Sequence, residues 1–165
     1  MARIAIALGS NLGDRIRFLQ LAIEQLVDHV EDIDLSPVYE SEPMYEPNQD
    51  TFYNAVLVGK ANIGPFSLLK ELKKIESELG RIDRGRNGPR EIDLDIIVFG
   101  RLSLNSCDLV LPHQRLQERR FVIQPLLDVW PDVWLAGMEK AKLLETVSDQ
   151  QLTRVKNAEF SVPRI

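Results

Sequence analysis

Hydrophobic residues follow two different spacings along the chain, and each spacing predicts one kind of element. Short apolar runs predict strands at residues 3–8, 33–39, 52–58 and 92–99. Apolar residues three and four positions apart predict two amphipathic helices, one capped by Asp14 and one ended by Gly80. Turn residues at 9–11 should end the first strand, and a polar loop should fill residues 40–51.

The second half of the chain continues this alternation. Residues 102–111 have the pattern of a further extended pair, and helical spacing returns at 115–129, where Pro125 weakens it, and at 139–147. The order strand, helix, strand, strand, helix, strand predicts an α+β fold with a ferredoxin-like βαββαβ core and an antiparallel sheet. Additional C-terminal helices should cover the second face and complete an αβα sandwich. We expect a single domain over residues 1–165.

Composition places the protein among ordinary globular chains. Hydrophobic residues make up 44% and charged residues 27%, which argues against disorder and coiled coil. The single cysteine, Cys107, excludes an internal disulfide and fits a reducing compartment. The longest apolar runs are far too short to cross a bilayer, and no signal-peptide pattern opens the chain. We therefore expect a cytoplasmic monomer with no membrane partner.

Positive charge is distributed unevenly. The formal net charge of −5 argues against general binding of nucleic acid, yet eight of the thirteen arginines lie between Arg81 and Arg120. A guanidinium group is a planar fork that can bind two phosphate or carboxylate oxygens at once. The arginines therefore indicate a site for a small polyanion. Carboxylates share the same window, so ion pairs on a solvated surface are the alternative.

The predicted strand at residues 92–99 carries two carboxylates. Because side chains alternate along a strand, Asp93 and Asp95 share one face, with Cα atoms about 6.6 Å apart. Hard oxygen ligands of this kind suit Mg²⁺, which completes its shell with water and substrate phosphates. An exposed strand face whose aspartates pair with arginines is the alternative. The arginine-rich loop at 81–90 favours a nucleoside triphosphate site, although the sequence holds no phosphate loop and no GxGxxG motif.

Three blocks of the sequence resemble one enzyme family. The run NGPREIDLDII at residues 87–97 resembles the GPR-x-x-D-L-D-I signature of the hydroxymethyldihydropterin pyrophosphokinases of folate synthesis. Residues 7–14 resemble that family's first strand and turn, and residues 111–126 resemble its third block. The blocks occur in the family's order within residues 4–131. The resemblance implies transfer of the terminal diphosphate of ATP to 6-hydroxymethyl-7,8-dihydropterin, with release of AMP.

The resemblance also implies roles for individual residues around the nucleotide. Matching aspartates in the family hold two magnesium ions, so Asp93 and Asp95 are implied as metal ligands and, with Arg81 and Arg90, as catalytic residues. Residues implied to contact ATP, the co-substrate, are Arg81, Arg84, Arg86, Arg90, His113, Arg119, Glu76, Leu69 and Ile96. For Glu76, a place on the helix surface is the alternative.

The pterin site is implied by a second set of matches. Asn54 matches an asparagine that hydrogen-bonds the heterocycle, and Phe52 and Phe121 match two aromatics that sandwich the ring. Ser41, Pro43, Met44 and Tyr45 would line the same pocket. Stacking suits a flat, partly polar ring, and an amide supplies both a donor and an acceptor. Without the family, the two phenylalanines would more often be core residues.

Three positions depart from the family pattern. Asn87 stands where many relatives have tryptophan, Lys73 replaces a glutamine that can contact adenine, and Asp108 falls where some relatives have a phosphate-binding arginine. We expect the loops at 40–51 and 81–90 to close over the substrates and exclude water. A regulatory module that binds a nucleotide without catalysis, and a magnesium-dependent phosphohydrolase, are the alternative functions.

Overall fold

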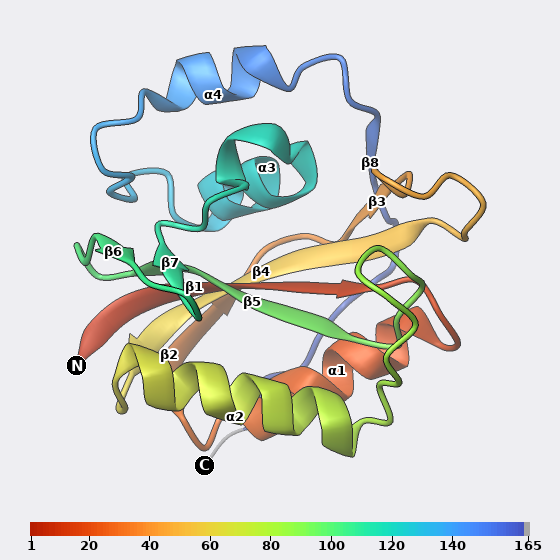
Figure 1. The fold of residues 1–165 in the computed structure, drawn as a ribbon, viewed down its shortest axis with the longest axis horizontal. Helices are drawn as coiled ribbons and strands as arrows, with labels where there is room; N and C mark the ends of the chain where they lie inside the picture. The colour runs from red at the N-terminus through yellow and green to blue at the C-terminus, as the bar shows by residue number, and fades with distance from the viewer. Residues whose placement is uncertain (164–165) are drawn as a thin grey trace.

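The computed structural model describes residues 1–163, and its order of elements confirms the predicted βαββαβ core (Figure 1). The strands are β1 (Ala2–Ser10), β2 (Val30–Leu35), β3 (Tyr39–Ser41), β4 (Phe52–Ala61), β5 (Asp93–Phe99), β6 (Leu104–Asn105), β7 (Val110–Leu111) and β8 (Leu152–Arg154). The helices are α1 (Arg15–Leu26), α2 (Pro65–Glu78), the short 3-10 helix η1 (Leu116–Glu118), α3 (Arg120–Val129) and α4 (Lys140–Thr146). Within residues 1–163, no helix has both the length and the apolar character needed to cross a membrane.

The main sheet has the strand order β5-β1-β4-β3-β8, and every neighbouring pair is antiparallel. β4 is long enough to pair with β3 near its start and with β2 near its end. Gly59 on β4 makes the second pairing possible, because a Cβ atom there would lie 2.4 Å from a side-chain carbon of Val30 on β2. β4 therefore lies at the centre of the sheet, and β1 lies between β4 and the edge strand β5.

Helices cover both faces of the sheet (Figure 1). α1 and α2 lie on one face, where side chains such as Ile6 and Leu8 of β1 pack against Leu19, Ile23 and Leu72. α3 lies on the other face, with α4 outside it, and forms a second core that includes Ala5, Val56, Val122, Leu126 and Leu143. Because side chains alternate along a strand, β1, β4 and β5 each contribute to both cores. The predicted αβα sandwich is confirmed.

Several element boundaries differ from the sequence prediction. β1 does not end before Gly9 but continues through Ser10, because it is paired on both sides and Ser10 still lies opposite Tyr53. The predicted strand at 33–39 is divided into β2 and β3 around Pro37, which lacks the N–H that a continuous ladder would need. The predicted helix at 115–129 starts as η1 and becomes α3 only at Arg120.

Candidate active site

One row of residues crosses three strands on the face covered by α3. Gly9 on β1 lies opposite Asp93 on β5 and opposite Asn54 on β4. Strands in a sheet are about 4.8 Å apart, so the backbones of Asp93 and Asn54 are separated by roughly 10 Å. Gly9 has no side chain to fill the space between them. A Cβ atom there would lie 3.6 Å from Asn54 Oδ1 and 3.8 Å from a ring carbon of Phe52.

A cavity of about 370 Å³ lies above this row, which is a usual size for a small-molecule site. Its floor comes from β1, β4 and β5, and its walls come from the loops at 42–49 and 81–90 and from residues 113–122. Its lining includes six cationic side chains and four carboxylates, those of Glu42, Glu46, Asp93 and Asp95. The cations are Lys73, Arg81, Arg86, Arg90, Arg115 and Arg119. A protein with a net charge of −5 therefore concentrates positive charge at this cavity.

Asp93 and Asp95 lie on the same side of β5, as the alternation predicted, and both line the cavity. Arg81 Nη1 lies 2.9 Å from Asp93 Oδ1, and Arg90 Nη1 lies 3.2 Å from Asp93 Oδ2. Burial and the neighbouring charge of Asp93 raise the pKa of Asp95. A cation that took Asp95 as a ligand would relieve both effects.

Glu76 lies beneath the arginines and holds two parts of the site together. Its carboxylate accepts a hydrogen bond of 2.8 Å from the backbone N–H of Leu94, between the two aspartates, and lies 2.8 Å from Arg81 Nη1. Only 4% of Glu76 is exposed, and this burial raises the pKa of its carboxyl group, although Lys73, Leu94 N–H and Arg81 oppose the shift. Arg81 thus bridges Glu76 on α2 and Asp93 on β5.

His113 and Arg119 approach from the opposite wall. Burial and the charge of Arg119 lower the pKa of His113 to about 4, so its ring is neutral near pH 7. The backbone N–H of Arg115 donates a 3.1 Å hydrogen bond to His113 Nδ1, which places the ring proton on Nε2. Among the described residues, Arg119 Nε and Ser10 Oγ are the buried side-chain polar atoms without a hydrogen-bond partner. Both the His113 N–H and the Arg119 fork are suited to an anion.

At the other end of the row, the orientation of the Asn54 amide is fixed. Its Nδ2 donates to Ser41 Oγ at 2.8 Å and to the Tyr39 carbonyl at 3.2 Å. The amide oxygen faces Gly9 on the cavity side. Phe52 and Phe121 line the cavity near it, and the Arg119 guanidinium lies 5.7 Å from the Phe121 ring. This end can therefore offer an acceptor and two aromatic faces to a flat polar ring.

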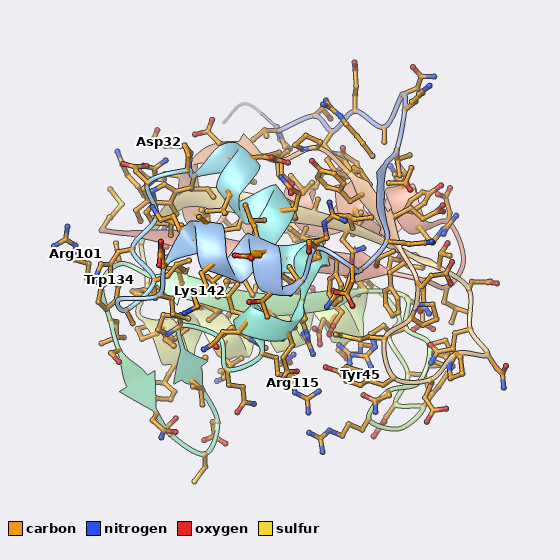
Figure 2. All side chains as sticks on the ribbon, turned by 90° about the horizontal axis from the view of Figure 1, so that it is seen from above. Asp32, Tyr45, Arg101, Arg115, Trp134 and Lys142 are labelled. Carbon is orange, nitrogen blue, oxygen red and sulfur yellow. The ribbon has the colours of Figure 1, made fainter. Side chains whose placement is uncertain are left out.

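The rim of the cavity includes two further side chains from separate loops. Figure 2 shows Tyr45 and Arg115 near each other, and the Arg115 guanidinium lies 5.2 Å from the centre of the Tyr45 ring. Met44 and Tyr45 are each 41% exposed, so the apolar part of this rim is open to solvent. Arg115 was counted in the arginine-rich window but was not predicted as a site residue, since no motif singles it out.

A buried asparagine joins the two loops that were expected to close. Asn11 Nδ2 donates to Gln49 Oε1 at 3.0 Å and to the Asp50 carbonyl at 3.2 Å, and Asn11 Oδ1 accepts from Arg90 N–H at 2.9 Å. Gln49 Nε2 in turn donates to the Asn87 carbonyl at 2.5 Å. Sequence reasoning treated Asn11 as a turn residue and missed this contact, because its partners are 38 to 79 positions away.

Most of the implied site residues meet at this cavity. Those that line it are Pro43, Met44, Tyr45, Phe52, Asn54, Arg81, Arg86, Arg90, Asp93, Asp95, His113, Arg119 and Phe121. Ser41 and Glu76 lie just behind the lining and contact it through the hydrogen bonds given above. Leu69 and Ile96 pack in the apolar layer between the sheet and α2, and Arg84 forms a two-bond ion pair with Glu91. The ligand contacts implied for all of these residues stay predictions, and for these last three the structure shows no place in the cavity lining.

The donor set at β5 fits a hard divalent cation. Asp93 and Asp95 supply two carboxylates on one face, and within residues 1–163 no cluster of three or more histidine, cysteine or acidic side chains is placed to hold a metal ion. Mg²⁺ is commonly bound by one or two carboxylates, with water and substrate phosphates completing the shell. These two residues would hold it together with a phosphate ligand.

Comparison with known proteins identifies the family. The profile of the 7,8-dihydro-6-hydroxymethylpterin-pyrophosphokinase family matches residues 5–131. The chain is also 42% identical to 2-amino-4-hydroxy-6-hydroxymethyldihydropteridine pyrophosphokinase of Aquifex aeolicus over 133 residues, which are 81% of this chain and 83% of that one. The chain belongs to this family. The Bacillus subtilis pyrophosphokinase is 41% identical, with 78% of each chain covered.

Other relatives of this chain are much longer. The folic acid synthesis protein fol1 of Pneumocystis carinii is 43% identical over 155 residues, and the chain spans only 21% of its length. Among solved structures, wild-type HPPK-DHPS of Plasmodium falciparum with SDX-DHP has a TM-score of 0.69 at 16% identity, over 87% of this chain and 44% of that one. That likeness confirms the fold. The family match ends at residue 131, so α4 and β8 lie beyond it.

Proposed function

We propose that this chain transfers the terminal diphosphate of ATP to the hydroxymethyl oxygen of 6-hydroxymethyl-7,8-dihydropterin in a magnesium-dependent reaction. The products are the pterin diphosphate and AMP, and the reaction is a step of tetrahydrofolate biosynthesis. The observation that carries the proposal is the row Asp93–Gly9–Asn54, which joins a cation site and a heterocycle site beneath one cavity. Work as a cytoplasmic monomer, without nucleic acid or membrane, is part of the same proposal.

The nucleotide end of the cavity comprises Glu76, Arg81, Arg90, Asp93, Asp95, His113 and Arg119. Its arginines bind the triphosphate oxygens, and the Nε2–H group of His113 donates a hydrogen bond to one of them. Mg²⁺ held by Asp93 and Asp95 supplies neutralisation of the charge that develops on the transferred group. Arg81 and Arg90, which contact Asp93 in this structure, are within reach of phosphate oxygens at the same place.

The pterin end comprises Ser41, Phe52, Asn54 and Phe121. Ser41 and the Tyr39 carbonyl hold the Asn54 amide so that its oxygen accepts from N–H donors on the pyrimidine-like edge of the pterin. Phe52 and Phe121 stack on the ring. In this proposal the hydroxymethyl oxygen lies over Gly9 and faces the nucleotide end.

The transfer breaks the bond between the bridging oxygen and the β-phosphorus of ATP. The bridging oxygen concerned is the one between the α- and β-phosphates, and it leaves with AMP. The pterin hydroxyl oxygen forms the new bond to the β-phosphorus, and its proton is released to solvent. Such reactions depend mainly on positioning and neutralisation of charge, so the site needs no strong general base. The loops joined by Asn11 exclude water that would otherwise hydrolyse ATP.

Analysis of the nucleotide products tests the proposal. ATP, Mg²⁺ and 6-hydroxymethyl-7,8-dihydropterin are supplied together, and each is then omitted in turn. Formation of AMP that requires both the pterin and Mg²⁺ is the expected result. Release of phosphate without pterin would indicate a phosphohydrolase instead, and intact ATP with a folded, nucleotide-binding protein would indicate a regulatory module.

A further inference from the structure

The turn that leads into α3 is held by a residue from the far end of the chain. Gln150 Oε1 accepts a 3.0 Å hydrogen bond from the backbone N–H of Arg120, and Gln150 Nε2 donates at 2.7 Å to the carbonyl of Glu118. The Gln150 carbonyl also accepts from Arg120 Nη1 at 2.6 Å. These contacts lie on either side of Arg119, which is the residue that reaches the cavity.

The start of α3 needs such a partner. The first N–H groups of a helix have no acceptor within the helix and are usually satisfied by a side chain just before it. Arg119 is the residue just before α3, and its side chain makes no hydrogen bond to the backbone N–H groups of the first turn. The Gln150 side chain supplies the missing acceptor from 30 residues away. It therefore fixes the backbone that directs Arg119 and Phe121.

The residues that follow Gln150 hold the opposite wall. Leu152 and Arg154 of β8 pair with Ser41 and Tyr39 of β3, and the Val155 N–H donates to the Val38 carbonyl at 2.8 Å. β3 supplies both acceptors that orient the Asn54 amide, the Tyr39 carbonyl and Ser41 Oγ. Residues 150–155 thus brace the wall that carries Arg119 and Phe121 and the wall that carries Ser41.

The two walls are also joined to each other. The Tyr39 hydroxyl donates a hydrogen bond to Asp128 on α3, and burial together with that bond raises the pKa of Tyr39 to about 12. The phenol therefore stays protonated and able to donate at physiological pH. β3 and α3 are linked here at a point away from the cavity. The contacts of residues 150–155 add a second link, at the end of α3 that faces the site.

We propose that Gln150 is a positioning residue for the transfer reaction, acting through Arg119 and Phe121 although it lies outside the part of the chain that defines the family. The inference rests on the proposed function. Because Gln150 holds the backbone at both sides of Arg119, its loss lets the guanidinium and the Phe121 ring move without removing either side chain. Small displacements of groups that orient substrates strongly slow a reaction that depends on positioning.

Two variants at adjacent glutamines test this role. Gln150→Ala removes the bonds to Arg120 N–H and Glu118 carbonyl, while Gln151→Ala changes an exposed neighbour of the same type. We expect Gln150→Ala to lower kcat/KM by roughly tenfold or more, with a lower kcat at saturating substrates. Gln151→Ala should match the wild type. Assays well below the melting temperature, with folding checked by circular dichroism, exclude a simple loss of folded protein.

A third variant and a second readout separate positioning from general stability. Gln150→Glu keeps an acceptor for Arg120 N–H but sets a carboxylate oxygen against the Glu118 carbonyl, so its kcat should be no higher than that of Gln150→Ala. Hydrogen exchange at residues 118–123 should be faster in Gln150→Ala than in Gln151→Ala. Normal kcat and KM in a fully folded Gln150→Ala protein would overturn the inference, as would unchanged exchange. A wild-type protein without pterin-dependent AMP formation would instead overturn the proposed function.

Discussion

At the nucleotide end of the cavity, charged side chains hold one another, whereas at the pterin end neutral groups from separate elements do so. Arg81 lies 2.8 Å from Glu76 and 2.9 Å from Asp93, all within one stretch of chain. The Asn54 amide instead depends on β3, which depends in turn on β8. The first end is thus specified locally, and the second is specified only by the completed fold.

This difference predicts that single substitutions can disable one end and leave the other able to bind. Charged groups act over several ångströms and are costly to remove singly, because the partner stays behind unpaired. Neutral hydrogen bonds contribute about 1 kcal/mol each and act only at contact. Substitutions at the nucleotide end, in the row between the ends, at the pterin end and at His113 can each test this difference.

Asp95→Asn should have the largest effect, at the nucleotide end alone. It removes one of the two carboxylates proposed to hold Mg²⁺, so turnover should fall by at least about a hundredfold, while pterin binding measured without ATP stays normal. Since burial and Asp93 raise the pKa of Asp95, removal of its charge should not lower the melting temperature. Asp28→Asn, at an exposed position between α1 and β2, is the matched control. Near-normal activity of Asp95→Asn would refute the metal assignment.

Gly9→Ala should act between the two ends. The added methyl group would sit at ordinary contact distance from Asn54 Oδ1 and Phe52, so the protein should fold while the floor of the cavity rises. We expect kcat/KM to fall by about tenfold, since both substrates are displaced from their line of reaction. Gly64→Ser is the control, because a side chain there meets open space at the start of α2, where serine is favoured. Unchanged kinetics would show that the substrates do not meet above Gly9.

Ser41→Ala should affect only the pterin end. It removes the nearest acceptor of the Asn54 amide nitrogen and leaves the more distant carbonyls of Tyr39 and Phe52. Loss of about 1 kcal/mol corresponds to roughly fivefold weaker pterin binding, which fluorescence titration can measure. The affinity for ATP with Mg²⁺ should not change. A parallel loss of ATP affinity would mean that the two ends are not independently held.

A substitution of His113 should change how the free energy of unfolding depends on pH. The unfolded chain takes up a proton on this ring near pH 6.5, whereas burial delays protonation in the folded protein to about pH 4. The contribution of His113 to stability is therefore complete above pH 6.5 and is lost progressively as the pH falls from 6.5 to 4. Urea unfolding of wild type and His113→Gln across this range should show a stability advantage of the wild type that shrinks as the pH falls, because the other titrating groups are common to both proteins. An imidazole that titrates near 6.5 by NMR would contradict the prediction.

The fold was largely predictable because its information is local. Helical and alternating spacings gave the core elements, and the alternation at β5 placed Asp93 and Asp95 correctly on one face. β8 was not predicted, since three residues with two exposed side chains carry no hydrophobic period. The division of the predicted strand at Pro37 could not be foreseen, because it depends on how β4 is shared between two partners.

The candidate site, like the fold, was predictable only where its residues are close together in the sequence. Arg81 to Asp95 could be recognised together because the motif is continuous in sequence. The contacts of Asn11 and Gln150 could not be foreseen, since an amide side chain has no pattern that names a partner 30 or more positions away. Gly9 was interpreted as a turn residue, and only the register of β1 with β4 and β5 shows that it separates the two ends.

The division into two helical layers has a practical consequence for optical experiments. The chain has two tryptophans. Trp130 packs in the core beneath α3, with the Arg3 guanidinium 4.5 Å from its ring, and Trp134 lies across α4 from Tyr45 and Arg115 in Figure 2. Intrinsic emission therefore reports the layer that the C-terminal segment braces, while circular dichroism reports α1 and α2 as well. Coincident unfolding curves from the two signals would mean that the layers separate in a single cooperative event.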